Sequence, residues 1–182
     1  TRTMDYFESI IKKLLEEEGY WVRQSFKVNL TKEEKRSIGK PSIPRPEIDL
    51  LAHQPSSGVV LAIEAKSYLD SPGVRFNELD IEHDIPEGRY KLFTSTKYRD
   101  VVFDRLKKDL IEAGMIDDDV LIQLGLVAGN IYQNRSTDIR KLLLSKSMFF
   151  WSPEDIKRKL STFAELKYEN DPVIITAKIL LR

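Results

Sequence analysis

Residues 47–68 read EIDLLAHQPSSGVVLAIEAKSY, and this stretch predicts the centre of the fold. We expect two adjacent strands, over residues 47–53 and 59–68, joined by a turn. The residues between them suit a turn, because proline restricts φ, glycine accepts a positive φ, and serine bonds to nearby backbone. Side chains on a strand alternate between its two faces, so Glu64 and Lys66 point the same way.

Three charged side chains interrupt these apolar strands. Asp49 lies between Ile48 and Leu50, and Glu64 and Lys66 follow the apolar run 59–63. Charged groups are costly to bury without partners. The 14 residues between Asp49 and Glu64 are enough for a hairpin turn. If the two strands pair, we expect Asp49, Glu64 and Lys66 to converge on one face at a strand end.

This pattern resembles the active-site motif of the PD-(D/E)xK nuclease superfamily. Asp49 stands in the place of the first acid, and Glu64-Ala65-Lys66 in the place of the (D/E)xK half. The proline that usually precedes the first acid is replaced by Ile48, with the nearest proline at Pro46. That departure is mild, because the acid carries the chemistry and the proline only shapes the start of the strand. A motif this short gains weight from its place on two strands after a helix.

The resemblance implies an activity and a set of roles. The chain would be a metal-dependent nuclease that hydrolyses phosphodiester bonds, with DNA as the expected substrate and endonuclease as the expected type. Asp49, Glu64 and the Ala65 carbonyl would hold Mg²⁺, for which Mn²⁺ can substitute, since Mg²⁺ prefers hard oxygen ligands. Lys66 would lie near the attacking water and the scissile phosphate. Paired cuts in a duplex need two active sites, which is compatible with a homodimer or a larger complex.

Two other classes of protein remain open. The first is a catalytically inactive nucleic-acid-binding module of the same fold, acting within a larger complex. The second is a structural or interaction protein in which Glu64 and Lys66 form an ion pair along one strand face. Metal binding without cleavage would favour the first, and absence of metal binding the second. Surface ion pairs add little stability, so the second leaves the charged cluster without an evident reason.

Residues 5–18 predict an amphipathic helix, because Phe7, Ile10, Ile11, Leu14 and Leu15 fall on one stripe. Glu8 lies at the border of that stripe. Many PD-(D/E)xK proteins carry a glutamate near the metals on their first helix, and Glu8 matches that place. The alternative is a solvated glutamate paired with Lys12 four residues on.

Residues 30–46 predict a long loop rich in basic side chains. Only Glu33 and Glu34 offset these charges. Loops of this length are usually functional or disordered. One hypothesis is that the loop contacts nucleic-acid phosphates beside the site, and the alternative is a plain solvated loop. The basic residues concerned are Lys32, Lys35, Arg36, Lys40 and Arg45.

The remaining sequence predicts alternating strands and helices, and therefore an α/β fold with a mixed sheet flanked by helices. The core of the PD-(D/E)xK enzymes has this order, so we expect one restriction-endonuclease-like domain over residues 1–182. Strands are predicted over residues 20–28, 89–94, 120–128, 147–151 and 173–181, and helices over residues 96–113, 137–145 and 153–168.

Composition sets further bounds. Charged residues make up 32% and hydrophobic residues 41% of the 182 residues, as in a globular protein. Basic and acidic residues number 29 each, so any nucleic-acid contact must come from a local basic patch and not from net charge. There is no cysteine, no long apolar run and no apolar leader at the start of the sequence. We therefore expect a cytoplasmic protein without membrane association.

Overall fold

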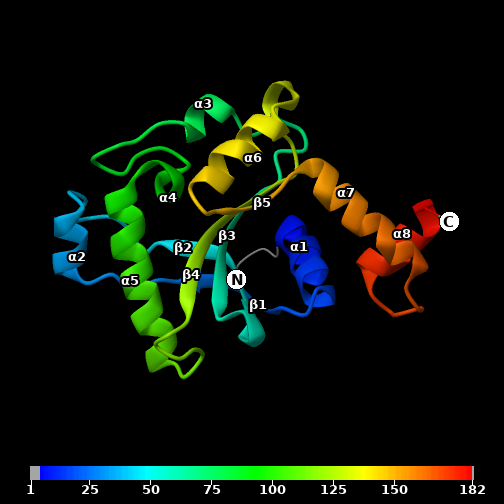
Figure 1. Cartoon of the computed structure of the whole chain (residues 1–182), viewed down its shortest axis with the longest axis horizontal. Coiled ribbons are helices and arrows are strands. Elements are labelled where there is room, and N and C mark those ends of the chain that lie inside the picture. The colour runs from blue at the N-terminus through cyan, green and yellow to red at the C-terminus, as the bar shows by residue number, and fades with distance from the viewer. Residues whose placement is uncertain (1–4, 182) are drawn as a thin grey trace.

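The computed structural model describes residues 5–181 and has a five-stranded mixed sheet with helices on both faces (Figure 1). The strand order follows the chain order. The strands are β1 (Trp21–Lys27), β2 (Glu47–Gln54), β3 (Val59–Lys66), β4 (Leu121–Ala128) and β5 (Phe149–Trp151). The α/β fold class predicted from the sequence is confirmed.

The strand directions divide the sheet at β3. β1 pairs antiparallel with β2, and β2 pairs antiparallel with β3. β3 pairs parallel with β4, and β4 pairs parallel with β5. The ladder between β3 and β4 runs from Val59–Leu121 to Lys66–Ala128. β3 is therefore the strand at which the sheet changes from antiparallel to parallel pairing.

Two layers of helices cover the sheet, one on each face (Figure 1). The first layer holds α3 (Phe76–Leu79), α4 (Lys91–Thr94), α5 (Thr96–Glu112) and α6 (Ser136–Ser145). The second layer holds α1 (Tyr6–Glu17), α7 (Pro153–Thr162) and α8 (Pro172–Leu181). The remaining helical elements are α2 (Lys32–Ser37) and the single turns η1 (Pro55–Ser57), η2 (Tyr132–Asn134) and η3 (Phe163–Glu165).

Each layer packs on its own hydrophobic cluster. Val102 and Leu106 of α5 pack with Val60 and Ala62 on one face of β3. On the opposite face, α1 packs against Leu61 and Ile63, and α7 and α8 belong to the same cluster. The alternation of β3 therefore assigns its even-numbered side chains, including Glu64 and Lys66, to the α5 side.

Three elements differ from the sequence prediction. Residues 32–37 form α2 where a loop was predicted, because Thr31 and Glu34 make a capping box that starts a helix. Residues 91–94 form one turn of helix, α4, where a strand was predicted. Residues 172–181 form α8 where a last strand was predicted, because Asp171 accepts hydrogen bonds from the amides of Val173 and Ile174 and so caps a helix. In addition, α7 ends at Thr162 and not near residue 168.

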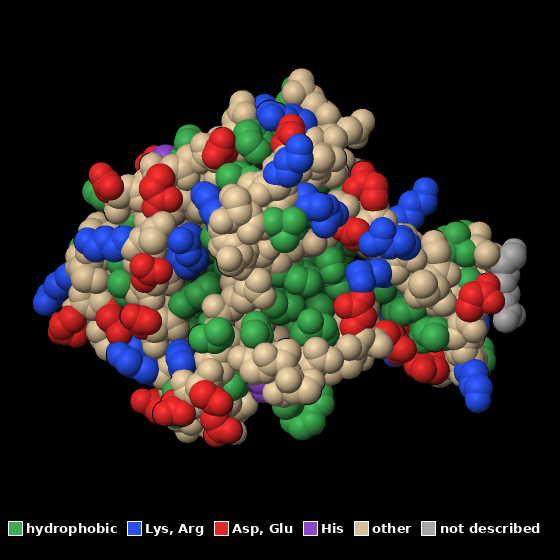
Figure 2. Space-filling view, in the orientation of Figure 1, with side chains coloured by type: hydrophobic (Ala, Val, Ile, Leu, Met, Phe, Trp, Pro, Cys, Tyr) green, Lys and Arg blue, Asp and Glu red, His purple; other side chains and the backbone are tan. Residues whose placement is uncertain are grey.

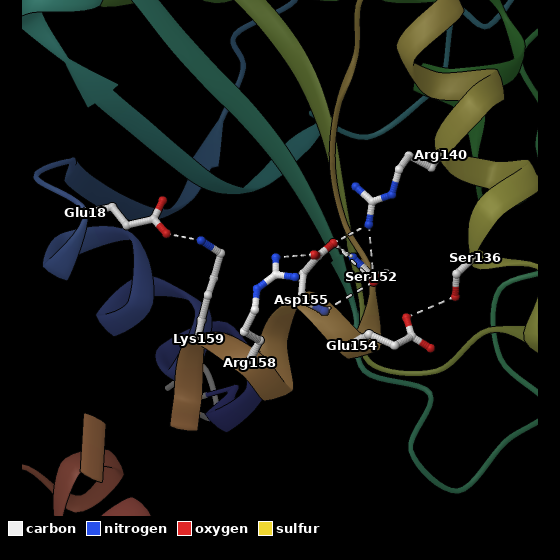
Figure 3. Close-up of polar contacts among 8 residues, drawn as sticks. All are labelled: Glu18, Ser136, Arg140, Ser152, Glu154, Asp155, Arg158 and Lys159. Carbon is white, nitrogen blue, oxygen red and sulfur yellow. Dashed lines mark hydrogen bonds and ion pairs between the residues drawn. The ribbon is translucent and has the colours of Figure 1, made fainter. Parts of the chain in front are cut away.

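The start of α7 is fixed by a polar cluster at the end of β5 (Figure 3). Ser152 and Asp155 form a capping box, in which the Ser152 amide donates to Asp155 at 3.0 Å and the Asp155 amide donates to Ser152 at 3.2 Å. Arg140 of α6 and Arg158 of α7 both donate to the Asp155 carboxylate. Helices from opposite layers are thus joined at the sheet edge.

On the face that Figure 2 shows, hydrophobic side chains gather in the middle and lysine and arginine side chains lie above and beside them. A shallow groove on the molecule includes Phe103, Leu121 and Ile122 from α5 and β4. Among the described residues, no helix has the length and apolar character that crossing a membrane requires.

Candidate functional site

The three charged side chains singled out in the sequence meet at the C-terminal end of β3. The Lys66 ammonium lies 3.0 Å from Glu64 Oε2 and 3.9 Å from Asp49 Oδ2. All three side chains are mostly buried, with exposed fractions of 18% for Asp49, 14% for Glu64 and 19% for Lys66. The expected convergence on one face is present in the fold.

Asp49 is oriented by the point at which β2 and β3 separate. The ladder between these strands ends at the Leu50–Ile63 pair. Beyond it, the Ala65 amide donates a 2.8 Å hydrogen bond to Asp49 Oδ2 in place of a backbone carbonyl. The Asp49 carboxylate therefore satisfies the backbone of β3 and faces Lys66 at the same time.

The neighbouring strand β1 carries a break at the same level. Its ladder with β2 would pair Ser25 with Asp49, and Ser25 has a positive φ of 61°. On β1, Val22 packs on the α1 side and Phe26 on the α5 side, although strict alternation would place both on one face. This break lies beside the position from which Asp49 reaches the end of β3.

Burial and neighbouring charges shift the pKa values of Glu64 and Lys66. Burial raises the pKa of Glu64, Lys66 offsets part of that rise, and Asp49 and Glu47 add to it. Burial alone would lower the pKa of Lys66, but the charges of Glu64 and Asp49 outweigh it and raise the pKa above its usual value. Lys66 is therefore a cation at neutral pH.

Glu64 also lines a cavity of about 200 Å³ on the α5 side of the sheet. Three segments that are distant in the sequence form this cavity. They are the stretch before β2, the end of β3, and the stretch through α4 to the start of α5. The lining residues are Ile43, Pro44, Arg45, Pro46, Glu47, Glu64, Gly88, Arg89, Tyr90, Lys91, Leu92, Phe93 and Tyr98. Burial raises the pKa of the Tyr98 phenol to about 12, and the nearby Glu64 charge adds to the rise.

Glu47 is a site residue that the sequence reasoning missed. It lines the same cavity as Glu64, and its charge raises the pKa of Glu64. The signal was present in the sequence, because Glu47 and Asp49 are two positions apart on a predicted strand and such side chains share a face in regular pairing.

Glu8 is buried, with 6% of its surface exposed, so the alternative of a solvated glutamate is wrong. Lys12 lies 3.7 Å from Glu16. Glu8 lies on the sheet-facing stripe of α1, and its neighbour Phe7 lies close to Gly129, beside the end of β3. α1 approaches from the sheet face opposite Glu64, and a part for Glu8 in the site stays a prediction.

The basic residues of the predicted loop divide into two groups. Lys32, Lys35 and Arg36 lie on α2, which is joined to α5 by Glu34 and Arg105 with a shortest contact of 2.7 Å. Arg45 lines the cavity with Glu64, and Lys40 lines an adjacent groove. The structure therefore brings only Arg45 into the cavity beside the charged cluster and leaves Lys40 next to it.

Asp49 and Glu64 fit a magnesium ion whose other ligands are waters and substrate phosphates, and not a site formed by protein side chains alone. Over residues 5–181, no three carboxylate, histidine or cysteine side chains gather in an arrangement suited to holding a metal ion. Asp49 and Glu64 supply two hard oxygen ligands that face one ammonium nitrogen. Mg²⁺ is usually bound by one or two carboxylates together with waters and substrate phosphates, which is the set that these two residues would begin.

No family model matches the chain, and no curated protein matches it either. One similar solved structure is described as "Crystal Structure of Protein of Unknown Function AF1548". It is 13% identical, with a TM-score of 0.42, and the alignment covers 97% of this chain and 79% of that one.

Proposed function

We propose that the protein is a metal-dependent nuclease that hydrolyses phosphodiester bonds of nucleic acid, with DNA as the expected substrate and internal cutting as the expected mode. The observation that carries this proposal is the meeting of Asp49, Glu64 and Lys66 at one end of β3, with both carboxylates within 3.9 Å of one ammonium nitrogen. A plain ion pair would need one carboxylate, and burying a second close to it raises its cost.

Asp49, Glu64 and the Ala65 carbonyl would hold Mg²⁺ or Mn²⁺. When bound, such an ion polarises phosphoryl oxygens and lowers the pKa of a bound water. Asp49 is already held in place by the Ala65 amide, so this ligand is oriented before any substrate arrives.

Lys66 would act on the phosphodiester by charge. Its raised pKa keeps the ammonium protonated, so it can donate hydrogen bonds to the phosphate oxygens and orient the attacking water. Negative charge grows on the phosphate as the water attacks, and a fixed cation in a water-poor site stabilises that state more than it would in bulk water.

The test is cleavage of linear, circular and single-stranded DNA, and of RNA, with Mg²⁺, Mn²⁺ or EDTA. Loss of closed circles would establish internal cutting, since a nuclease that needs an end leaves them intact. We expect Asp49→Asn, Glu64→Gln and Lys66→Met each to lower the rate by about 10²-fold or more. Asp118→Asn is the control, because Asp118 is exposed and precedes the N-terminal end of β4, at the opposite edge of the sheet from the charged cluster.

Two results would contradict the proposal. One is cleavage that survives in Lys66→Met at the wild-type rate. The other is nucleic-acid binding by the wild-type protein with no cleavage under any metal, which would favour the inactive binding module of the same fold. The three substitutions are close in size to the native residues, so circular dichroism should show an unchanged fold in each.

A further inference from the structure

The cavity beside Glu64 has an acidic floor and a basic rim. Glu64 is mostly buried at the end of β3, whereas Arg45 and Arg89 are exposed at the opening and Lys91 is half-buried. Arg45 comes from the stretch before β2, and Arg89 and Lys91 come from the stretch that leads into α4. An acidic floor under a basic rim is complementary to a cation with an anion above it.

The rim cations make no ion pair with a carboxylate among the described residues. Across residues 5–181, neither Arg89 nor Lys91 lies within ion-pair distance of a carboxylate, and Arg45 bonds only to the Asn29 amide oxygen, at 3.1 Å. Three basic side chains of α6 and α7 differ, because carboxylates hold them (Figure 3). Arg140 and Arg158 share Asp155, and Lys159 contacts Glu18. The rim cations are therefore available for a ligand.

Tyr68 connects the rim to the charged cluster. Its hydroxyl contacts Arg89 and Tyr90, raising the pKa of both, although burial is the larger cause for Tyr90. Tyr68 also lies close enough to Lys66 to raise its pKa slightly. Gly88 has a positive φ of 71°, a backbone conformation that glycine adopts without strain and that turns the chain into Arg89.

The size of the space indicates the size of the ligand. The cavity is about 200 Å³, below the roughly 300 Å³ at which pockets for whole small molecules begin. It continues into a groove of about 350 Å³ that shares Ile43 and Lys91 with it and adds Lys40. A cavity for one phosphate-sized group, followed by a groove with further cations, suits a strand of nucleic acid better than a free nucleotide.

We propose that Arg45, Arg89 and Lys91 bind a backbone phosphate adjacent to the scissile one, and that Lys40 and Lys91 guide the same strand along the neighbouring groove. This proposal rests on the proposed nuclease function, for which it names the path of the cut strand. Phosphate contacts of this kind are electrostatic and independent of base sequence. The cavity and the groove thus position a nucleic-acid strand and do not select a base sequence.

The experiment measures binding without cleavage. A short fluorescein-labelled oligonucleotide, single-stranded or duplex, is titrated in EDTA at salt concentrations from about 50 to 200 mM, and anisotropy is recorded. We expect Arg89→Gln and Lys91→Gln each to weaken binding by about tenfold at the lowest salt. Each lost phosphate contact should also reduce the slope of log affinity against log salt, by about 0.7 for a single strand.

Two further variants serve as controls. Lys157→Gln removes an exposed lysine of α7 in the other helical layer, and its affinity should equal that of the wild type. Arg89→Lys keeps the charge, so its salt slope should stay at the wild-type value. Circular dichroism checks the fold, and Arg89 is exposed, so its loss should leave the fold intact.

The outcomes separate this proposal from the nuclease function. If Arg89→Gln and Lys91→Gln bind like Lys157→Gln while the wild-type protein cleaves, the path is wrong and the nuclease function stands. If binding depends on Arg89 and Lys91 but no substrate is cleaved, the cleft is a nucleic-acid site and the nuclease function is wrong. Absence of any binding and of any cleavage would overturn both.

Discussion

At a single residue, Glu64, the fold and the proposed metal binding favour different protonation states. It is held in a mostly buried position beside two other carboxylates, and burial is the main reason that its pKa is raised. A raised carboxyl pKa means that the folded protein prefers the protonated form. The charged form that a metal site needs is therefore the form that the fold disfavours.

This conflict predicts how Glu64→Gln changes stability with pH. Because the folded pKa is above the unfolded one, the stabilising contribution of Glu64 is fully present below the unfolded pKa and is lost as pH rises through the folded pKa. Glutamine does not titrate, so its stability relative to the wild type should improve as pH rises through that range. Urea unfolding of both proteins at several pH values measures the difference. A difference in unfolding free energy between the two proteins that does not change with pH would contradict the raised pKa of Glu64.

Asp155 shows the opposite case. Burial alone would raise its pKa, but hydrogen bonds from the Ser152 backbone and from Arg140 outweigh burial and lower the pKa to about 2, from an ordinary value of 3.8. The carboxylate should therefore stabilise the fold by about 2 kcal/mol, on the scale of 1.36 kcal/mol for each pKa unit. That stability is present above the unfolded pKa and is lost as pH falls through the folded one.

We therefore expect Asp155→Asn to lower the free energy of unfolding by about 2 kcal/mol near neutral pH. The difference from the wild type should shrink as pH falls from about 4 toward about 2. Denaturant unfolding at two pH values is the measurement, with Asp118→Asn as an exposed aspartate for comparison. An equal loss at both pH values would mean that packing, and not charge, holds α7 at the end of β5.

At the scale of elements, the sequence predicted the strands of the site well because their signals are local. The apolar runs with a Pro-Ser-Ser-Gly turn between them define β2 and β3, and the polar residues that break those runs are the site. Strand alternation then places Glu64 and Lys66 on one face. Glu47 was overlooked although it stands two positions from Asp49, and Arg89 and Lys91 were overlooked because the cavity they share with Glu64 is formed by segments distant in the sequence.

The mispredicted elements show that helix capping can outweigh the intrinsic strand propensity of a segment. Residues 173–181 are rich in β-branched and aliphatic side chains, yet Asp171 and Pro172 begin a helix there, as Ser152 and Pro153 do for α7. The Asp-Pro pair starts a helix, and not the strand predicted over residues 173–181. The same holds for Thr31 and Glu34, whose capping box is visible in the sequence of the predicted loop. No local signal marks α4, whose one turn is buried against α5.

At the scale of the molecule, the site lies where the two halves of the sheet meet. β3 pairs antiparallel with β2 and parallel with β4, so the C-terminal end of β3 lies beside the N-terminal end of β2 and the C-terminal end of β4. Ligands of open α/β sheets commonly bind outside the carboxyl ends of strands. Helices α5 and α1 cover opposite faces of the sheet, and the cavity beside Glu64 lies on the α5 side.

This position predicts that a divalent ion stabilises the whole fold, apart from any catalysis. An ion that binds only the folded protein raises the free energy of unfolding by RT ln(1 + [L]/Kd), which is about 1.4 kcal/mol at ten times Kd. For a chain of this length, 1 kcal/mol raises Tm by roughly 2 to 4 °C. We expect Mg²⁺ to raise Tm by a few degrees in the wild type and in Asp118→Asn, reversibly with EDTA. Asp49→Asn and Glu64→Gln should show no such rise, because each lacks one of the two carboxylates. A rise that persists in Asp49→Asn would place the ion elsewhere and remove the link between the charged cluster and the metal.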